Sequence, residues 1–272
     1  MVVYESKFTM TDQALQTEIQ GGVATVRMNR PDVHNAFDDH LIAELTAELR
    51  RLDQYADARV VVLAANGKSF SAGADLNWMQ RMAKYSEAEN LRDAVAMAGL
   101  MRSLHGMHKP TIARVQGAAF GGGVGLVACC DVAVAAAEAS FSLSEVRLGL
   151  IPSVISPYVI AAIGEREARR YFLTAERFGA EEARRIGLVH EVTAGERLDE
   201  AVKNVADHLL QGGPNALAAA KKLIADVARR PLDDALMEET ARRIASIRVS
   251  AEGREGLGAF LQKRAPAWTR KS

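Results

Sequence analysis

Residues 118–137 read AAFGGGVGLVACCDVAVAAA and form the most apolar stretch of this 272-residue chain. Adjacent glycines are costly inside a helix, so we place the three near its start in the first turn of a buried helix that runs into a buried strand. Asp131 and the clustering of the glycines argue against a membrane span. The free N–H groups and the dipole at the start of a helix favour negative charge. The stretch therefore predicts a site at which backbone N–H groups bind a negatively charged group.

Other interpretations of the glycines stay open. Close helix packing without a ligand would use the same residues. Gly123 to Ala128 also fit the G-x-G-x-x-A pattern of dinucleotide-binding proteins, with Glu145 about where a ribose-binding acid would fall, but this pattern is weak alone. A phosphate loop at Gly67-Lys68-Ser69 is excluded, because Val62 stands where the motif requires its first glycine.

Strand and helix signals alternate in the first half of the chain. Gly21-Gly22 separates two strand-like segments and predicts a two-residue hairpin turn. A helix from about Asp38 to Asp53 carries an apolar stripe. This alternation predicts an α/β fold with a largely parallel sheet. The expected strands are 15–20, 23–28, 59–63, 111–115 and 132–135, and a second helix is expected at 86–105.

The pattern changes to helices beyond about Ile160. Only Leu188 to Val192 is strand-like in this part. We expect the C-terminal third to be a helical layer that needs a partner surface, because its helices are strongly amphipathic. The expected helices are 165–174, 180–186, 199–211, 214–228, 232–249 and 253–263.

Composition excludes several classes of function. The formal net charge is +0, so nothing in the charge balance recruits nucleic acid or an anionic membrane. The neighbouring Cys129 and Cys130 cannot staple a framework, which fits a reducing compartment. Met1 to Asp12 lacks a secretory signal and is interpreted as a ragged terminus, so we expect a cytoplasmic protein.

Two further segments carry candidate chemistry. Ser69 to Leu76 is a run of small residues that leaves backbone accessible, with Asp75 as a helix cap; a plain turn would look the same. Ser142 to Pro152 holds the lone acid Glu145 among apolar residues. A buried Glu145 would resist ionisation and hold a proton that it can transfer, whereas an ion pair with Arg147 would make it structural.

These three segments together resemble the crotonase, or enoyl-CoA hydratase/isomerase, superfamily from about Thr17 to Trp268. The resemblance implies a spiral of ββα turns at residues 1–195 with the CoA and oxyanion site, and a C-terminal helical trimerisation region at 196–272. It also implies trimers or hexamers and no cofactor beyond the CoA of the substrate. Supporting pieces are Asn29-Arg30-Pro31, Asn35-Ala36, Lys109 to Ala113, Ala128 to Asp131, Leu173-Thr174 and Gly187 to Val189.

The resemblance also assigns roles to residues. It gives the oxyanion hole to the backbone N–H groups of Ala74 and Gly122 and the proton transfer to Glu145. It makes Lys68 a contact of the CoA, together with Phe260 and Lys263 from a neighbouring subunit. The backbone near Val33 and His34 would line the nucleotide. The remaining expected substrate contacts are Ala72, Asp75, Leu76, Gly121, Gly125 and Pro152, and no metal ligand is expected.

One departure concerns Gly125, where many family hydratases carry a second glutamate. The resemblance is closest to bacterial methylglutaconyl-CoA hydratases of leucine and acyclic-terpene breakdown, which share this glycine. We therefore expect hydration of a branched 2-enoyl-CoA, with the water held by Glu145 or by Ser153, Ser156 or Tyr158. An enoyl-CoA isomerase with Glu145 as its single proton shuttle and a non-catalytic binding or RNA-associated protein are the alternatives.

Overall fold

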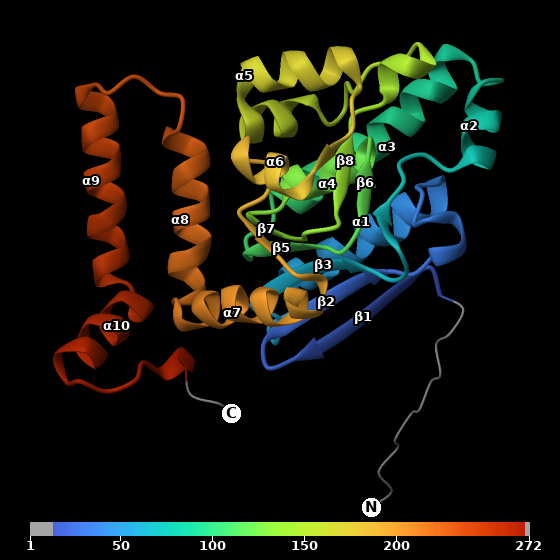
Figure 1. Ribbon diagram of the computed structural model, residues 1–272. Helices are drawn as coiled ribbons and strands as arrows, with labels where there is room; N and C mark the ends of the chain where they lie inside the picture. Colours follow the sequence, from blue (N-terminus) through green and yellow to red (C-terminus); the bar gives the residue numbers. More distant parts are fainter. Residues whose placement is uncertain (1–12, 270–272) are drawn as a thin grey trace, which may run out of the picture.

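The structure is a computed structural model and describes residues 13–269. The expectation of a ragged N-terminus lies outside these residues. The described chain consists of two sheets, the helices that cover them, and a C-terminal group of helices that projects from the rest (Figure 1).

The larger sheet has six strands and matches the prediction of a largely parallel arrangement. Its order is β1-β2-β3-β5-β7-β10, and only the β1–β2 pair is antiparallel. Gly21 and Gly22 join this pair with positive φ angles of 57° and 86°, which confirms the predicted hairpin turn. The strands are β1 (Leu15–Gln20), β2 (Val23–Met28), β3 (Val60–Ala65), β5 (Thr111–Val115), β7 (Val132–Ala136) and β10 (Glu191–Thr193).

Helices cover both faces of this sheet. All six residues of β3 are buried, as expected for a strand between two layers. Val61 and Leu63 belong to the core that includes α1 (Asp39–Gln54), whereas Val60 and Val62 pack with α7 (Leu198–Gln211). The alternation of side chains along one strand therefore holds two helical layers in place.

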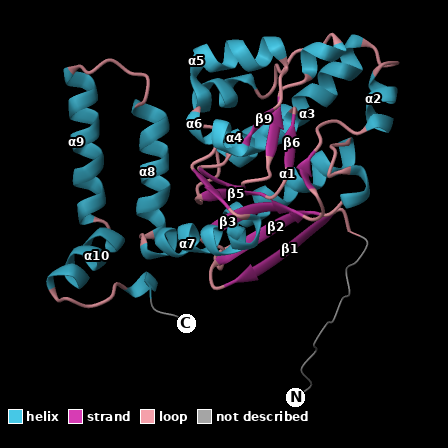
Figure 2. Cartoon of the chain, in the orientation of Figure 1, coloured by secondary structure: helices cyan, strands magenta, loops and turns pink. Residues whose placement is uncertain are grey.

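The second sheet is small and was not predicted. It contains β4 (Ser69–Ser71), β6 (Ala118–Phe120), β8 (Ser140–Ser142) and β9 (Phe178–Gly179) in that order, and its first three strands run parallel. Strands of two or three residues are too short to show a period in the sequence. Figure 2 shows these short strands beside the larger sheet, surrounded by helices.

The predicted helices form with recognisable caps. Asp38 caps α1 by accepting a hydrogen bond from the Leu41 N–H, and Ser86 opens α3 (Glu87–His105) with a capping box that includes Glu89. The apolar stretch 118–137 contains α4 (Gly122–Cys129) followed by β7, which confirms the predicted helix and strand. The other core helices are α2 (Leu76–Met82), α5 (Ser156–Thr174), which kinks at Gly164, and α6 (Ala180–Arg185).

Three helices project from the core as a C-terminal arm, which confirms the predicted helical layer. They are α8 (Pro214–Val227), α9 (Asp234–Val249) and α10 (Ala251–Leu261). Figure 1 shows α8 and α9 side by side, and an ion pair of 2.7 Å joins Arg243 to Asp226 between them. The division expected at residue 195 stays a prediction; α7, which follows it, packs on the sheet.

Candidate active site

Three parallel strands of the small sheet end at one edge, and each is followed within three residues by a predicted site residue. The register pairs Ser71 with Ala119 and Phe120 with Ser142. Ala74, Gly122 and Glu145 come three, two and three positions after the last residues of β4, β6 and β8. Because the carboxyl ends of neighbouring parallel strands meet at one edge, the fold brings these three residues to the same place.

Ala74 presents a free backbone donor. An isolated parallel bridge pairs it with Phe37, through bonds from the Phe37 N–H to the Gly73 oxygen (2.7 Å) and from the Asp75 N–H to the Phe37 oxygen (2.8 Å). These two bonds use the backbone N–H and oxygen of Phe37, the oxygen of Gly73 and the N–H of Asp75, and they use no polar group of Ala74. The Ala74 N–H itself therefore points away from the bridge and has no acceptor within residues 13–269.

Gly121 and Gly122 present a second donor at the start of α4. The Gly121 N–H is used, since it donates to the Ser142 oxygen at 2.9 Å. Gly121 has φ +49° and ψ −118°, a conformation that a residue with a side chain would find strained. As the first residue of the helix, Gly122 has an N–H without an acceptor in the helix, and the helix dipole adds positive potential there.

The glycines leave no free volume beside the strands. A Cβ atom on Gly123 would lie 2.7 Å from the Ser71 oxygen, and one on Gly122 would lie 2.6 Å from Met97 Cε and 3.1 Å from Phe37 Cε2. The start of α4 therefore packs directly on the end of β4. Close helix packing without a ligand was the alternative interpretation of these glycines. In the structure the close packing and the free N–H groups occur together, so the packing does not exclude a binding site.

The Glu145 carboxyl group lies against the same backbone. A Cβ atom on Gly121 would be 3.1 Å from Glu145 Oε1. Glu145 Oε2 is buried and has no hydrogen-bond partner among the described residues, and no ion pair with Arg147 forms there. Burial raises the pKa of Glu145 above its ordinary value, and the hydrogen bond from its own backbone opposes this shift. A partly buried carboxyl group with a raised pKa and one oxygen without a partner is suited to proton transfer.

A neighbouring side chain fills the space beside Gly125. A Cβ atom there would lie 2.2 Å from Ile155 Cγ2 and 3.3 Å from Met101 Cε. Gly123 likewise packs on Ser71, so groups of the protein itself occupy the space beside both glycines of the dinucleotide pattern. This packing counts against the dinucleotide interpretation. Ile155, Met97 and Phe37 were not among the predicted site residues, because no local pattern marks side chains that arrive from distant segments.

The residues expected to contact the CoA gather next to this edge. The turn at Pro31–Val33 lies against the loop before β4, since a Cβ atom on Gly67 would be 2.7 Å from Pro31 Cβ. His34 Nδ1 lies 3.0 Å from Ser69 Oγ, and the Ala72 N–H donates to the His34 oxygen at 3.0 Å. Val33 and Lys68 are both exposed beside these contacts.

The remaining predicted residues divide into two groups. Asp75 is buried and caps α2, Leu76 is 75% exposed beside it, and Pro152 is buried in the loop after Glu145. Phe260 lies in α10 and Lys263 follows the end of that helix. Figure 1 shows α10 apart from α4 and β6 of the same chain, where the candidate site lies. The expected contact of Phe260 and Lys263 with a neighbouring subunit stays a prediction.

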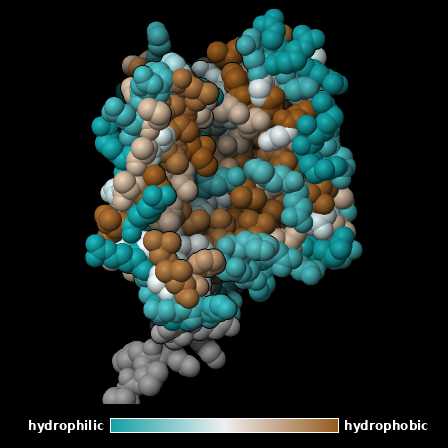
Figure 3. Space-filling view, turned by 90° about the vertical axis from the view of Figure 1, so that its left-hand side faces the viewer, coloured by the Kyte–Doolittle hydropathy of each residue, from teal (hydrophilic) through white to brown (hydrophobic). Residues whose placement is uncertain are grey.

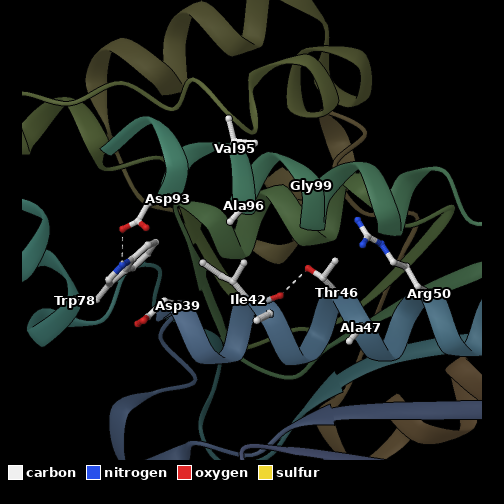
Figure 4. Close-up of a pocket in the computed structure, with 11 residues that line it drawn as sticks. Asp39, Ile42, Thr46, Ala47, Arg50, Trp78, Asp93, Val95, Ala96 and Gly99 are labelled. Atoms are coloured by element: carbon white, nitrogen blue, oxygen red, sulfur yellow. Dashed lines mark hydrogen bonds between the residues drawn. The ribbon is translucent and has the colours of Figure 1, made fainter. Parts of the chain in front are cut away.

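A separate cleft of about 470 Å³ lies between α1 and α3 and contains none of the predicted site residues. Figure 4 shows Trp78 at one end, where its indole N–H donates to Asp93 at 3.1 Å, and Arg50 near the other. Its lining between these ends includes Ile42, Thr46 and Val95, and the described residues hold no group of three His, Cys, Asp or Glu that could bind a metal ion. We therefore place the candidate chemistry at the strand edge, where the unpaired polar groups lie.

The fold and this edge define an α/β protein that offers two backbone donors beside a carboxyl group. Comparison with known proteins is consistent with this description. Residues 18–271 match the family model of enoyl-CoA hydratase/isomerase. The chain belongs to that family.

Individual relatives resemble the chain over nearly its whole length. The crystal structure of an enoyl-CoA hydratase from Shewanella pealeana has a TM-score of 0.92 at 46% identity, covering 96% of this chain and 100% of that one. The 2,3-dehydroadipyl-CoA hydratase of Escherichia coli is 34% identical, over 91% of this chain and 95% of its own. The Pseudomonas aeruginosa protein AtuE has a TM-score of 0.89 at 37% identity, covering 95% of this chain and 100% of that one. The predicted family and its crotonase fold are confirmed.

Among residues 13–269, no helix combines the length and the apolar character that crossing a bilayer requires.

Proposed function

We propose that this protein is an enoyl-CoA hydratase that adds water reversibly to a 2-enoyl-CoA thioester. The backbone N–H groups of Ala74 and Gly122 hold the thioester oxygen, and Glu145 transfers the proton at the α carbon. One observation supports the proposal: the Glu145 carboxyl group, with one buried oxygen that has no partner, lies against Gly121, next to the unused N–H of Gly122. Gly73, next to the unused N–H of Ala74, approaches the same turn, because a Cβ atom on it would lie 3.3 Å from the Phe120 oxygen. Unused donors aimed at a developing charge are worth more in such a site than in water.

The proposed reaction balances with a single carboxyl group. The oxygen of water bonds to the β carbon, and the electron pair of the double bond moves toward the thioester oxygen to form an enolate. Glu145 then gives its proton to the α carbon, and the resulting carboxylate takes the proton that the water loses. The raised pKa of Glu145 supports this role, because it favours the neutral acid at the start of the cycle.

The proposed substrate is a branched enoyl-CoA of the methylglutaconyl type. Apolar side chains border the site, since Met97 and Ile155 pack on the glycines of α4. The relative from Escherichia coli is named for hydration of 2,3-dehydroadipyl-CoA, another enoyl thioester. The sequence resemblance to methylglutaconyl-CoA hydratases supports the branched acyl group.

An enoyl-CoA isomerase is the second candidate. It is favoured by the presence of one carboxyl group at the site, because Ile155 fills the space that a glutamate at position 125 would need. A single carboxyl can remove a proton from one carbon and return it to another.

Turnover of purified protein distinguishes these candidates. Straight, branched and carboxylated 2-enoyl-CoAs are each incubated with the protein, and loss of the conjugated double bond is followed by absorbance and mass. We expect addition of one water, fastest for a branched acyl group. Migration of the double bond without water addition would favour the isomerase, and the absence of both reactions would contradict the proposal.

A further inference from the structure

The segment that presents Ala74 has little structure of its own. It lies between the end of β4 at Ser71 and the start of α2 at Leu76, and Gly73 within it has φ +90°. Three backbone hydrogen bonds tie it to the segment before α1: the Ala72 N–H donates to the His34 oxygen, and the two bonds of the bridge to Phe37 lie on either side of Ala74. The direction of the Ala74 N–H therefore depends on what holds the two sides of this bridge together.

The Arg30 guanidinium group spans the bridge. Its Nη1 donates to the Ala36 oxygen at 2.7 Å, and its Nη2 lies 2.9 Å from Asp38 Oδ2. The same Nη2 lies 3.3 Å from Asp75 Oδ2 on the other side. Ala36 and Asp38 flank Phe37, and Asp75 follows Ala74, so one planar cation ties residues next to both members of the bridge.

The two carboxylates that meet Arg30 also begin helices. Asp38 Oδ1 accepts from the Leu41 N–H of α1, and Asp75 Oδ1 accepts from the Asn77 N–H of α2, each at 2.8 Å. Each aspartate thus uses one oxygen for its helix and the other for Arg30. The Asp75 side chain is only 7% exposed, so breaking its contact with Arg30 would leave a buried polar group without this partner.

Arg30 is itself fixed by a buried amide. Its backbone N–H donates to Asn35 Oδ1 at 2.8 Å, and Asn35 is fully buried. The Asn35 side-chain amide donates to the Asn66 and Ser69 oxygens, each at 2.8 Å, at the start of β4. The arginine is therefore anchored to the same strand whose end presents the donor.

We propose that Arg30 is the positioning residue of the Ala74 donor. Its fork of N–H groups holds the bridge at Phe37 and so fixes where the Ala74 N–H points. The inference rests on the proposed function, because it concerns the donor that holds the thioester oxygen. A lysine at this position would keep the charge but offer a point contact in place of a planar fork with several acceptors.

The test compares Arg30→Met and Arg30→Lys with the native protein, using two readouts. The first is turnover of the enoyl-CoA that the native protein converts. The second is the infrared carbonyl stretch of bound isovaleryl-CoA, which has no double bond to hydrate. Hydrogen bonds to the carbonyl oxygen lower this frequency, so the second readout follows the donor directly and a loss of general stability does not imitate it. Arg51→Met is the matched control, because Arg51 pairs with Glu48 at 2.7 Å on the exposed surface of α1.

We expect Arg30→Met to lose most of the frequency lowering and to reduce kcat by about tenfold to a hundredfold, with a smaller change in KM. Arg30→Lys should lie between it and the native protein, and Arg51→Met should match the native protein. If folded Arg30→Met shows the native carbonyl frequency, the positioning role of Arg30 is wrong, and the proposed function is unaffected. If the native protein itself does not lower the frequency, the proposed oxyanion site is wrong as well. Should Arg30→Met not fold, Asp38→Asn, which keeps a helix cap, is expected to lose part of the lowering, and a native frequency there overturns the inference.

Discussion

Gly125 and Ile155 form a matched pair at the residue scale. Since a Cβ atom at position 125 would lie 2.2 Å from Ile155 Cγ2, a larger residue fits only if Ile155 shrinks. We expect Gly125→Glu to lower the free energy of unfolding by about 1–3 kcal/mol or more. Combined with Ile155→Ala, the loss should be smaller than the sum of the single losses by at least about 1 kcal/mol.

Urea denaturation of the two single variants and the double variant measures this coupling. Gly99→Glu is the control, because no atom lies within 4 Å of a Cβ atom at that helical position. Strictly additive losses for positions 125 and 155 would show that the two side chains do not compete for one space.

Glu145 should make stability depend on pH. Burial raises its pKa in the folded state, so between the unfolded and the folded pKa the native protein binds more protons than the unfolded chain. Its contribution to stability is complete at acid pH and is lost as the pH rises through the folded pKa. We expect Glu145→Gln to be more stable than the native protein at neutral pH, and the difference to vanish below about pH 4. Denaturation across a pH series checks this, and a constant difference would contradict it.

Some of these residues could be predicted from the sequence and others could not. Glu145 stands out as a lone acid in an apolar segment, and Gly121 to Gly123 as adjacent glycines before a helix. Ile155 packs on a residue thirty positions earlier, and Arg30 reaches Asp75 across forty-five positions. Such contacts depend on strand register, which no local pattern specifies.

At the scale of elements, the close approach of α4 to β4 brings the two candidate donors together. A Cβ atom on Gly123 would lie 2.7 Å from the backbone oxygen of Ser71, which cannot move without moving the strand. We expect Gly123→Ala to lower the free energy of unfolding by about 1–3 kcal/mol. In contrast, Gly99→Ala on α3 should be neutral or raise it by up to about 1 kcal/mol, because a helical glycine is replaced in open space.

Denaturant titration of both variants measures these changes. Equal effects at positions 99 and 123 would mean that the contact between α4 and β4 does not constrain the fold.

The strongly patterned elements were predicted well, and the small sheet was not. In strands and amphipathic helices of five or more residues, apolar side chains recur at a regular spacing that can be recognised in the sequence, as in β2 and α1. The strands β4, β6 and β8 have three residues each and gain their pairing from the elements around them. They are the elements whose ends carry the candidate site, so the sequence indicated the residues of the site without indicating the sheet that assembles them.

At the scale of the whole molecule, the C-terminal arm exposes a large apolar surface. Figure 3 faces this side and shows apolar residues gathered around a hollow. Phe260 is 81% exposed and Leu261 is 78% exposed. Exposed apolar surface of this extent is typical of an interaction site. The other large exposed apolar residues from α8 onward are Ile224, Leu232, Met237, Ile244, Val249 and Leu257.

We propose that this surface packs on further copies of the chain in a trimer or hexamer, and that Phe260 and Lys263 reach the site of a neighbour. Sedimentation should then give three or six times the chain mass of 29.4 kDa. Phe260→Asp combined with Leu261→Asp should shift the protein toward monomers, because it places charge in the apolar contact. Tyr55→Asp, at an exposed position outside the arm, should leave the mass unchanged. A native monomer would contradict the assembly.

The proposed chemistry needs one carboxyl group beside two backbone donors, and Glu145→Gln removes the function of that carboxyl group alone. Glutamine keeps the shape of the side chain but cannot transfer a proton. In the variant we expect kcat to fall by about a hundredfold to ten-thousandfold, while the dissociation constant of isovaleryl-CoA stays near the native value. A variant that binds isovaleryl-CoA as the native protein does and still converts the enoyl-CoA at the native rate would show that Glu145 does not transfer the proton.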